Sequence, residues 1–143
     1  MNAERIKRQI IRHEGKRISN NRHMLYKCSA GKWTLGYGRN VEARGISEEE
    51  AVEMLENDIE DCCIDLADIF TQFAAFPEKI QHILVDMRFQ LGYGGFRGFK
   101  RMIEAVKNKD WKRMRTEMIA SNWFEQSGQR ALNLLKMVDE VIG

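Results

Sequence analysis

Apolar residues recur every three or four positions along most of the chain, which is the spacing of amphipathic helices. A short helix of this kind is predicted over Ala3–Arg12, with isoleucines on one side. The strongest pattern predicts one long helix over residues 47–71 with an acidic outer face. Its apolar stripe consists of Val52, Leu55, Ile59, Cys62, Leu66, Ile69 and Phe73.

Start and stop signals support the long helix and those that follow. Ser47 and Glu50 have the spacing of a capping box, in which each side chain bonds the backbone N–H of the other residue. Pro77 suits the first turn of the next helix, and Gly92 is a natural stop for it. Further helices are predicted over residues 98–108, 110–120 and 128–142.

The β-type pattern is confined to the N-terminal part of the chain. Met24–Cys28 and Lys32–Tyr37 are short β-type runs separated by Ser29–Gly31, which predicts a hairpin, whereas Ser19–His23 is predicted to be loop. The pattern therefore predicts an α+β fold that is predominantly α. The long helix would join a small β-containing lobe to a helical lobe.

Length and composition narrow the class of protein. A chain of 143 residues suits one domain. Its composition, with 43% hydrophobic and 31% charged residues, argues against disorder. No apolar run is long enough to span a membrane, and the N-terminal charges indicate a chain made in the cytoplasm without a signal peptide. Three cysteines, of which Cys62 and Cys63 are adjacent, do not form the pattern of a disulfide framework.

Charge is distributed unevenly although the net charge is only +2. Residues 1–39 carry +8, residues 40–76 carry −10 and residues 77–143 carry +4. Two basic segments around an acidic one suit a polyanionic partner such as nucleic acid or bacterial cell wall. Solvated basic faces and one acidic helix would explain the same distribution.

The predicted hairpin has one face that could carry chemistry. A turn centred on Gly31 would place Cys28 directly opposite Thr34, on the face that also carries Gly36 and Gly38. A thiol, a hydroxyl and two bare glycines can line a surface that a sugar approaches closely. A hairpin with bulge glycines and a small packed cysteine is the competing interpretation.

Glu14 is predicted to lie where the first helix ends, and a partly desolvated carboxyl there would suit a general acid.

Two other motifs do not qualify as cofactor or metal sites. The glycine-rich segment 92–98 mimics a dinucleotide fingerprint but follows a helix instead of a strand. His13-Glu14 lacks the second histidine of a zinc-protease motif, and no metal site is predicted.

Several separated motifs together resemble the phage-type lysozyme (endolysin) family of glycoside hydrolases. They are Glu14-Gly15, Tyr26-Lys27-Cys28, Trp33–Gly38, Gly45-Ile46-Ser47, Phe89–Gly92, and Ser121–Gln126 leading to Arg130-Ala131. The resemblance implies a single lysozyme-like domain over residues 1–143. Its parts would be a small lobe at about 13–46, a connecting helix at about 47–71, and a helical lobe at about 72–143 that includes the N-terminal helix.

The resemblance also implies roles for single residues. Glu14 takes the place of the acid that protonates the glycosidic oxygen, and Thr34 that of a threonine that helps to hold the attacking water. Cys28 stands where most members have a catalytic aspartate, and it lies fourteen positions after Glu14 where nine are usual. The implied substrate contacts are Asn40, Phe89, Gln90, Met102 and Glu117. Arg39 replaces a family histidine, and we expect it to pair with Asp58.

The activity implied is that of a muramidase, which hydrolyses the β-1,4 bond between N-acetylmuramic acid and N-acetylglucosamine in peptidoglycan without metal or organic cofactor. A lytic transglycosylase acting on the same bond and a non-catalytic cell-wall or nucleic-acid binder are the alternatives. Peptidoglycan is the expected partner of a monomer that binds no nucleic acid and does not insert stably into membranes. The family implies an endolysin that reaches the cell wall after holin-type release at host lysis.

Overall fold

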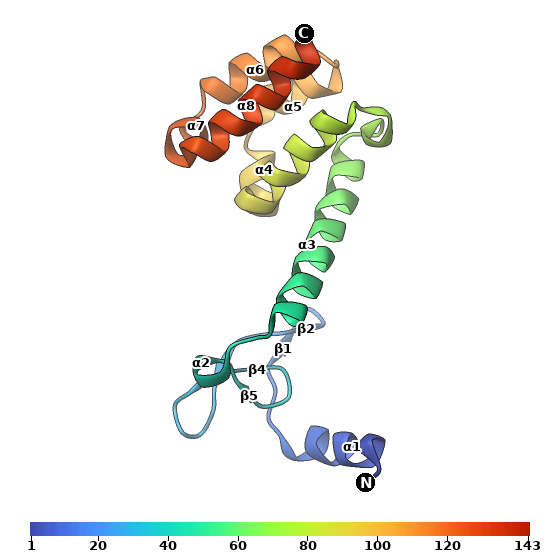
Figure 1. The fold of residues 1–143 in the computed structure, drawn as a ribbon, viewed down its shortest axis with the longest axis vertical. Helices are drawn as coiled ribbons and strands as arrows, with labels where there is room; N and C mark the ends of the chain where they lie inside the picture. Colours follow the sequence, from blue (N-terminus) through green and yellow to red (C-terminus); the bar gives the residue numbers. More distant parts are fainter. The chain divides into compact units, whose positions relative to one another are not determined.

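The computed structural model describes residues 1–143, which form two units, Met1–Glu53 and Met54–Gly143. Eight α-helices and two small antiparallel sheets confirm the predicted α+β class with a predominance of helix. Figure 1 follows these elements by colour from the N-terminal helix in blue to the C-terminal helix in red. None of the helices combines the length and the apolar character needed to cross a membrane.

The first unit contains both sheets. Its elements are α1 Ala3–His13, β1 Ile18–Ser19, β2 Arg22–His23, β3 Tyr26–Lys27, β4 Trp33–Leu35, β5 Arg39–Asn40, α2 Val41–Arg44 and the start of α3 Glu48–Ile69. Strands β1 and β2 form one sheet, and β3, β4 and β5 form the other in that order. Strand β5 and helix α2 were not predicted, because two- and four-residue elements are too short to show a period.

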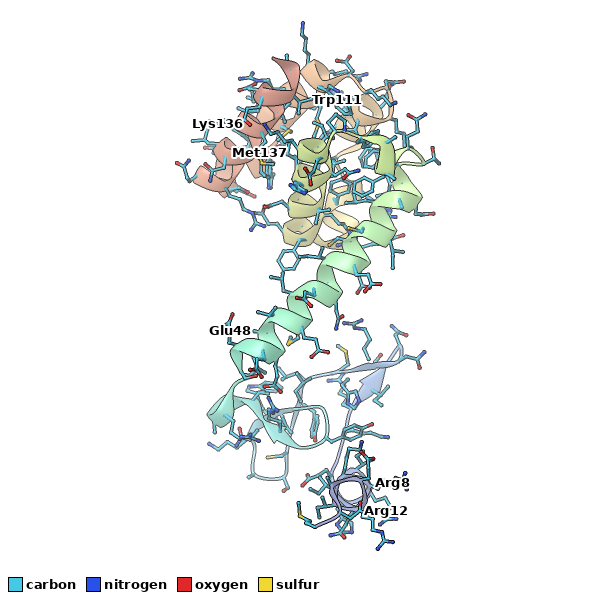
Figure 2. The ribbon with its side chains drawn as sticks, turned by 45° about the vertical axis from the view of Figure 1, so that its right-hand side comes forward. Arg8, Arg12, Glu48, Trp111, Lys136 and Met137 are labelled. Atoms are coloured by element: carbon cyan, nitrogen blue, oxygen red, sulfur yellow. The ribbon has the colours of Figure 1, made fainter.

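Helix α1 begins at Ala3, where the side chain of Asn2 accepts a hydrogen bond of 3.0 Å from the Arg5 N–H. It ends at His13, because Glu14 adopts an extended conformation. None of its residues is buried, although the helix is strongly amphipathic. Figure 2 shows Arg8 and Arg12 projecting outward from it. The predicted short helix is therefore confirmed and is one residue longer.

The segment Ser19–His23, predicted to be loop, is part of a hairpin. Ile18 pairs with His23 across it, and the turn is made by Asn20 and Asn21. Both asparagines have positive φ, 51° and 62°, which is the conformation of a tight type I′ turn. Asparagine tolerates this conformation better than most residues, so the Asn-Asn pair was the signal that the sequence interpretation missed.

Helix α3 begins with the predicted capping box. The Ser47 N–H donates to Oε1 of Glu50 at 2.8 Å, and the Glu50 N–H donates to the Ser47 hydroxyl at 3.1 Å. The stripe along α3 is buried at Cys62 and Leu66. Phe73, assigned to the same stripe, lies beyond the helix in a separate 3-10 turn.

Replacing Ser47 with alanine removes one of the two capping bonds. We expect the free energy of unfolding to fall by about 1 kcal/mol, since an exposed helix N–H loses its side-chain acceptor. Urea denaturation followed by circular dichroism measures the change. Ser47→Asp, which restores an acceptor, is the matched control and should recover most of the loss; an equal loss in both variants would contradict the capping role.

The second unit is helical. Its elements, after the rest of α3, are the 3-10 turn η1 Phe73–Ala75, α4 Glu78–Arg97, α5 Lys100–Lys107, α6 Trp111–Ile119, α7 Asn122–Ser127 and α8 Gln129–Ile142. Pro77 precedes α4 as predicted, and Gly92 interrupts the helix with φ 76° and ψ 175°. The three later helices are confirmed with slightly narrower bounds. Helix α7 was not predicted separately; the Ser121 side chain caps it.

A continuous apolar core holds these helices together. Its largest fully buried side chains come from α3 through α8 and the segments between them: Phe70, Phe96, Leu66, Ile80, Ile83, Leu84, Met87, Met102, Met114, Met118, Val106 and Val138. Aromatic rings meet edge to face within it, among them Phe70 with Phe76 and Phe76 with Trp111. Burial of this apolar surface is the main stabilising contribution to the unit.

A buried carboxylate ties α3 to α4. Asp65 is only 8% exposed and accepts hydrogen bonds from Nε of Arg88 at 2.6 Å and from Nη1 of Arg97 at 2.8 Å. Burial alone would raise the pKa of this carboxyl. The two guanidinium groups outweigh that effect, so the pKa of Asp65 is lowered.

This lowered pKa predicts how stability depends on pH. A carboxyl whose pKa is lower in the folded state stabilises the fold above its unfolded pKa, and the contribution disappears as the pH falls through the folded pKa. We therefore expect the stability difference between wild type and Asp65→Asn to be full at pH 7 and to shrink in strong acid. Denaturant titrations at several pH values measure it; a difference that did not change with pH would contradict the ion-pair account.

Candidate active site

The carboxyl of Glu14 lies against the backbone of Gly38 in the first unit. A methyl group at Gly38 would lie 2.5 Å from Oε2 of Glu14 and 2.7 Å from its carboxyl carbon, so the Glu14 side chain would have to move to admit it. Gly38 also has φ +85°, a conformation that other residues rarely adopt. Glu14 is exposed, so the desolvation expected at the end of α1 is not produced by this unit.

The segment that carries Glu14 is attached to the three-stranded sheet. The hydroxyl of Tyr26, on β3, donates a hydrogen bond of 2.8 Å to the carbonyl of Gly15. This bond ties the segment that follows α1 to strand β3. Tyr26 belongs to one of the motifs identified in the sequence, but no role was predicted for it.

The register of the β3–β4 hairpin differs from the prediction by two residues. Thr34 pairs with Tyr26, not with Cys28, and the Cys28 N–H donates to the Lys32 carbonyl at 2.9 Å. The turn is therefore centred on Ala30, and the predicted pairing of Cys28 with Thr34 is wrong. Because a shift of two keeps the same alternation, both side chains still belong to one face of the sheet.

The half-buried thiol of Cys28 is surrounded by hydrogen-bond donors. The backbone N–H groups of Lys32 and Ala30 point toward it and lower its pKa, because they stabilise the thiolate. Cysteine reacts as the thiolate, so this environment raises the fraction of Cys28 that is ionised and reactive near neutral pH.

Thr34 is almost fully buried, with 2% of its surface exposed. Its hydroxyl donates a hydrogen bond of 2.9 Å to the Lys32 carbonyl. The single hydroxyl proton is thereby used. Toward a water molecule, the Thr34 hydroxyl can therefore only accept a hydrogen bond.

Asn40 and Arg39 are tied to the elements next to the sheet. The Asn40 side chain accepts a 3.0 Å hydrogen bond from the Ala43 N–H and so caps α2. Nη1 of Arg39 lies 2.6 Å from Oε1 of Glu50, so its partner is not Asp58 and that prediction is wrong. The Arg39 bond and the Ser47 N–H lower the pKa of Glu50 to about 2. The pair is consequently charged at any pH near neutrality.

Four of the residues assigned to substrate contacts lie in the second unit. Phe89 is 43% exposed and Gln90 is exposed on the same part of α4. Gln90 is fixed at both ends of its amide, since its oxygen accepts from Nε1 of Trp123 at 2.9 Å and its nitrogen donates to the Ser127 hydroxyl at 3.0 Å. Nothing in the sequence pattern indicated that these two residues anchor the amide.

Met102 and Glu117 share a pocket of about 570 Å³. Polar and charged groups surround its apolar floor; the lining includes Leu91, Phe99, Lys100, Arg101, Ser121, Asn122, Trp123 and Gln126. Met102 is 1% exposed and belongs to the core, so it can act only as part of the floor. The volume lies within the range of about 300–1,000 Å³ that is typical of small-molecule sites.

The first unit contains groups of the kinds that acid–base chemistry uses. It offers an exposed carboxyl, a thiol with a lowered pKa and a buried hydroxyl acceptor, on residues 14, 28 and 34. No three histidine, cysteine, aspartate or glutamate side chains converge as metal ligands. A reaction that needs a proton donor and a polarised water is the chemistry these groups support.

Comparison with known proteins agrees with this chemistry. The sequence profile of the family described as phage lysozyme matches residues 16–137, which is most of the chain. The pre-baseplate central spike protein Gp5 of Enterobacteria phage T4 is 28% identical over 106 residues. That match covers 71% of this chain and 18% of the spike protein, so the chain spans less than a fifth of that relative's length. The profile begins two residues after Glu14, whose role therefore rests on its motif and geometry.

Proposed function

The chain belongs to the phage lysozyme family, whose members break down peptidoglycan, and we propose that it is a muramidase. The bond cleaved is the β-1,4 link between N-acetylmuramic acid and N-acetylglucosamine. The single observation that carries this proposal is the exposed carboxyl of Glu14, held against Gly38 at the end of α1. A carboxylic acid that can donate a proton to the glycosidic oxygen is the first requirement for breaking a glycosidic bond.

The proposed reaction uses three side chains of the first unit. Glu14 donates its proton to the glycosidic oxygen, the bond from that oxygen to the anomeric carbon breaks, and positive charge develops on the sugar ring. A water molecule whose proton points to Thr34 attacks the anomeric carbon. Cys28, as thiolate, accepts the other proton of that water and so replaces the usual second carboxylate.

Two other roles for Cys28 are compatible with the same overall reaction. The thiolate could attack the anomeric carbon directly and form a glycosyl–enzyme intermediate that water then hydrolyses. Alternatively, Cys28 only fills space and Thr34 orients the water without help. The lowered pKa of Cys28 favours a thiolate role over the packing role, and the variants described in the Discussion separate them.

Asn40, Phe89, Gln90, Met102 and Glu117 are the proposed saccharide contacts. The Gln90 amide is held at both ends, so a sugar would be contacted through the one N–H that its bond to Ser127 leaves over. Phe89 offers an exposed ring on which a sugar can pack. Met102 contributes only pocket floor, and Asn40 has its side-chain oxygen engaged in the α2 cap.

The products of digestion test the proposal. Purified peptidoglycan incubated with the protein should release muropeptides with reducing ends, which mass spectrometry identifies. Anhydro ends would instead establish the alternative, a lytic transglycosylase that needs only one glutamate. Intact peptidoglycan, with undiminished binding by Glu14→Gln, would establish a non-catalytic cell-wall binder.

The biological setting is a separate proposal. A monomeric endolysin that reaches the wall after holin-type release would degrade the whole wall at host lysis. The matched relative is named as a spike protein of a phage baseplate, which suggests a second setting in which a lysozyme acts locally on the wall. Expression of this chain inside bacteria with and without a holin distinguishes them, since an endolysin lyses the culture only when the holin is present.

A further inference from the structure

Tyr93 is an exposed aromatic residue that the proposed mechanism does not use. It lies in the glycine-rich segment 92–98, directly after the break at Gly92, and 60% of its surface is exposed. The guanidinium carbon of Arg97 lies 3.5 Å from the centroid of its ring. One face of the ring is therefore covered by a cation, and the side chain as a whole stays largely open to solvent.

The cation behind the ring is itself fixed. Arg97 donates two hydrogen bonds to the buried carboxylate of Asp65, and Nη2 of Arg97 lies 3.8 Å from Asp68. Asp65 also accepts from Arg88, whose guanidinium carbon lies 5.8 Å from the same ring. Because the Arg97 guanidinium is fixed by these bonds, the Tyr93 ring that stacks on it is kept in one orientation.

A small hollow lies beside this ring. Its volume is about 270 Å³, and Asp58, Asp61, Cys62, Arg88 and Phe89 line it. Arg88 connects the hollow to Tyr93, because it lines the hollow and its guanidinium carbon lies 5.8 Å from the centroid of the Tyr93 ring. This volume is below the roughly 300 Å³ at which pockets for whole drug-sized ligands begin, and suits one sugar ring.

We propose that Tyr93 and this hollow form an additional saccharide subsite, in which a pyranose ring of the glycan strand packs on the exposed part of the Tyr93 ring. Aromatic rings present a broad apolar face with little side-chain freedom to lose, which suits the C–H face of a sugar. The carboxylates of Asp58 and Asp61 accept hydrogen bonds from sugar hydroxyls, and Arg88 donates to ring or carbonyl oxygens.

This subsite deepens the proposed function and rests on it, because the ligand is the glycan strand of peptidoglycan. It adds a residue that determines substrate affinity, whereas the groups that break the bond are elsewhere. The subsite would extend contact from Phe89, which lines the hollow and is already a proposed saccharide contact. Its loss should weaken substrate binding and leave the bond-breaking step intact.

The test compares Tyr93→Ala with Tyr93→Trp and with Ile64→Ala. Ile64 is a matched control, since it is an exposed apolar residue of the same unit, 65% exposed, and lies outside the hollow. Turnover of purified peptidoglycan and sedimentation with it are measured, the latter in the Glu14→Gln background so that the substrate is not consumed. We expect Tyr93→Ala to raise KM and weaken sedimentation by about 3- to 10-fold with kcat unchanged. Tyr93→Trp and Ile64→Ala should bind like wild type.

A second variant tests whether the cation orients the ring. Arg97→Lys keeps the charge but removes the planar group that stacks on Tyr93, and we expect an intermediate rise in KM with unchanged kcat. Thermal unfolding of all variants is recorded in parallel. A lower Tm with unchanged KM in Tyr93→Ala would show that the ring only stabilises the segment, and would overturn the subsite.

The outcomes also distinguish this inference from the proposed function. If wild type digests peptidoglycan and Tyr93→Ala has the same KM and sedimentation, the subsite fails while the enzyme assignment stands. If wild type releases no muropeptides, the proposed function fails. In that case the sedimentation experiment still decides whether Tyr93 binds glycan.

Discussion

Replacing Glu14 with glutamine should reduce the rate of peptidoglycan hydrolysis by about 10²–10⁴-fold while leaving substrate affinity and fold intact. The amide has the size of the carboxyl but cannot donate a proton to the glycosidic oxygen, and positioned acid catalysis is worth roughly this factor. The loss should appear in kcat, with little change in KM. Turbidity loss of outer-membrane-permeabilised bacteria and release of reducing ends measure it.

The matched control is Glu4→Gln, on the same helix. Glu4 is exposed and its carboxylate pairs with Lys7, so its replacement removes the same charge without touching the proposed site. Near wild-type turnover in Glu14→Gln would refute the assignment of the acid. A comparable loss in Glu4→Gln would show that the charge of the helix, not the proton of residue 14, is what matters.

A further variant disturbs Glu14 without replacing it. In Gly38→Ala the added methyl group would meet the Glu14 carboxyl at 2.5 Å and would force a residue other than glycine to adopt φ +85°. We expect the carboxyl to be displaced and kcat to fall, since small misplacements of a catalytic group cost about 10²-fold. Gly31→Ala is the control, because Gly31 also has positive φ but no atom lies near its missing side chain.

Replacing Cys28 with alanine should reduce kcat by at least about 10²-fold, because the group proposed to accept the proton of the attacking water is removed. Cys28→Asp should keep substantial activity, since an aspartate occupies this position in most family members. Alanine is smaller than cysteine and aspartate is close to it in size, and the position is only half-buried. Circular dichroism should therefore show an intact fold in both variants.

Cys28→Asp should also change the pH dependence of kcat/KM. The reaction needs one group protonated and the other ionised, and an ordinary thiol ionises near pH 8.5 whereas an aspartate ionises near pH 3.9. The amides of Lys32 and Ala30 lower the pKa of Cys28. Whichever group titrates first, exchanging the thiol for a carboxylate should move the pH optimum of kcat/KM to lower pH.

Alkylation tests the thiol in the unmodified site. Cys62 is 3% exposed and its pKa is raised by burial, so it should react slowly, whereas the half-buried Cys63 could obscure the result. The experiment therefore uses Cys63→Ser. Iodoacetamide should inactivate this variant faster as the pH rises, and soluble glycan fragments should protect it. Full activity of Cys28→Ala with an unchanged pH profile would leave Thr34 as the only group that orients water.

Much of the fold followed from local patterns. The long helix, its capping box and the break at Gly92 were predictable because they depend on periodicity and on residues within one or two turns. Elements of two to six residues were missed, since β1, β2, β5, α2 and α7 contain too few positions for a period to be visible. The Asn20-Asn21 turn was a local signal that the interpretation did not use.

The residues of the candidate site were identified from their motifs, but their environment was not. Spacing placed Glu14 at a helix end and Cys28 with Thr34 on one face, which the structure shares. It gave the wrong partner for Thr34, because a turn centred on Ala30 or on Gly31 fits the sequence pattern equally well and only the packed sheet selects the register.

What the sequence by itself determined is therefore the fold class, the helix boundaries and the kinds of side chain available for chemistry, since these depend on neighbours along the chain. Only the tertiary structure decided which groups meet. It placed the Glu14 carboxyl on Gly38, gave Arg39 to Glu50 and set Tyr93 on a guanidinium fixed by Asp65. The Arg39–Glu50 and Asp65–Arg97 contacts join residues 11 and 32 positions apart, so their energies depend on packing that no local pattern encodes, whereas Tyr93 and Arg97 lie four positions apart within one helical segment.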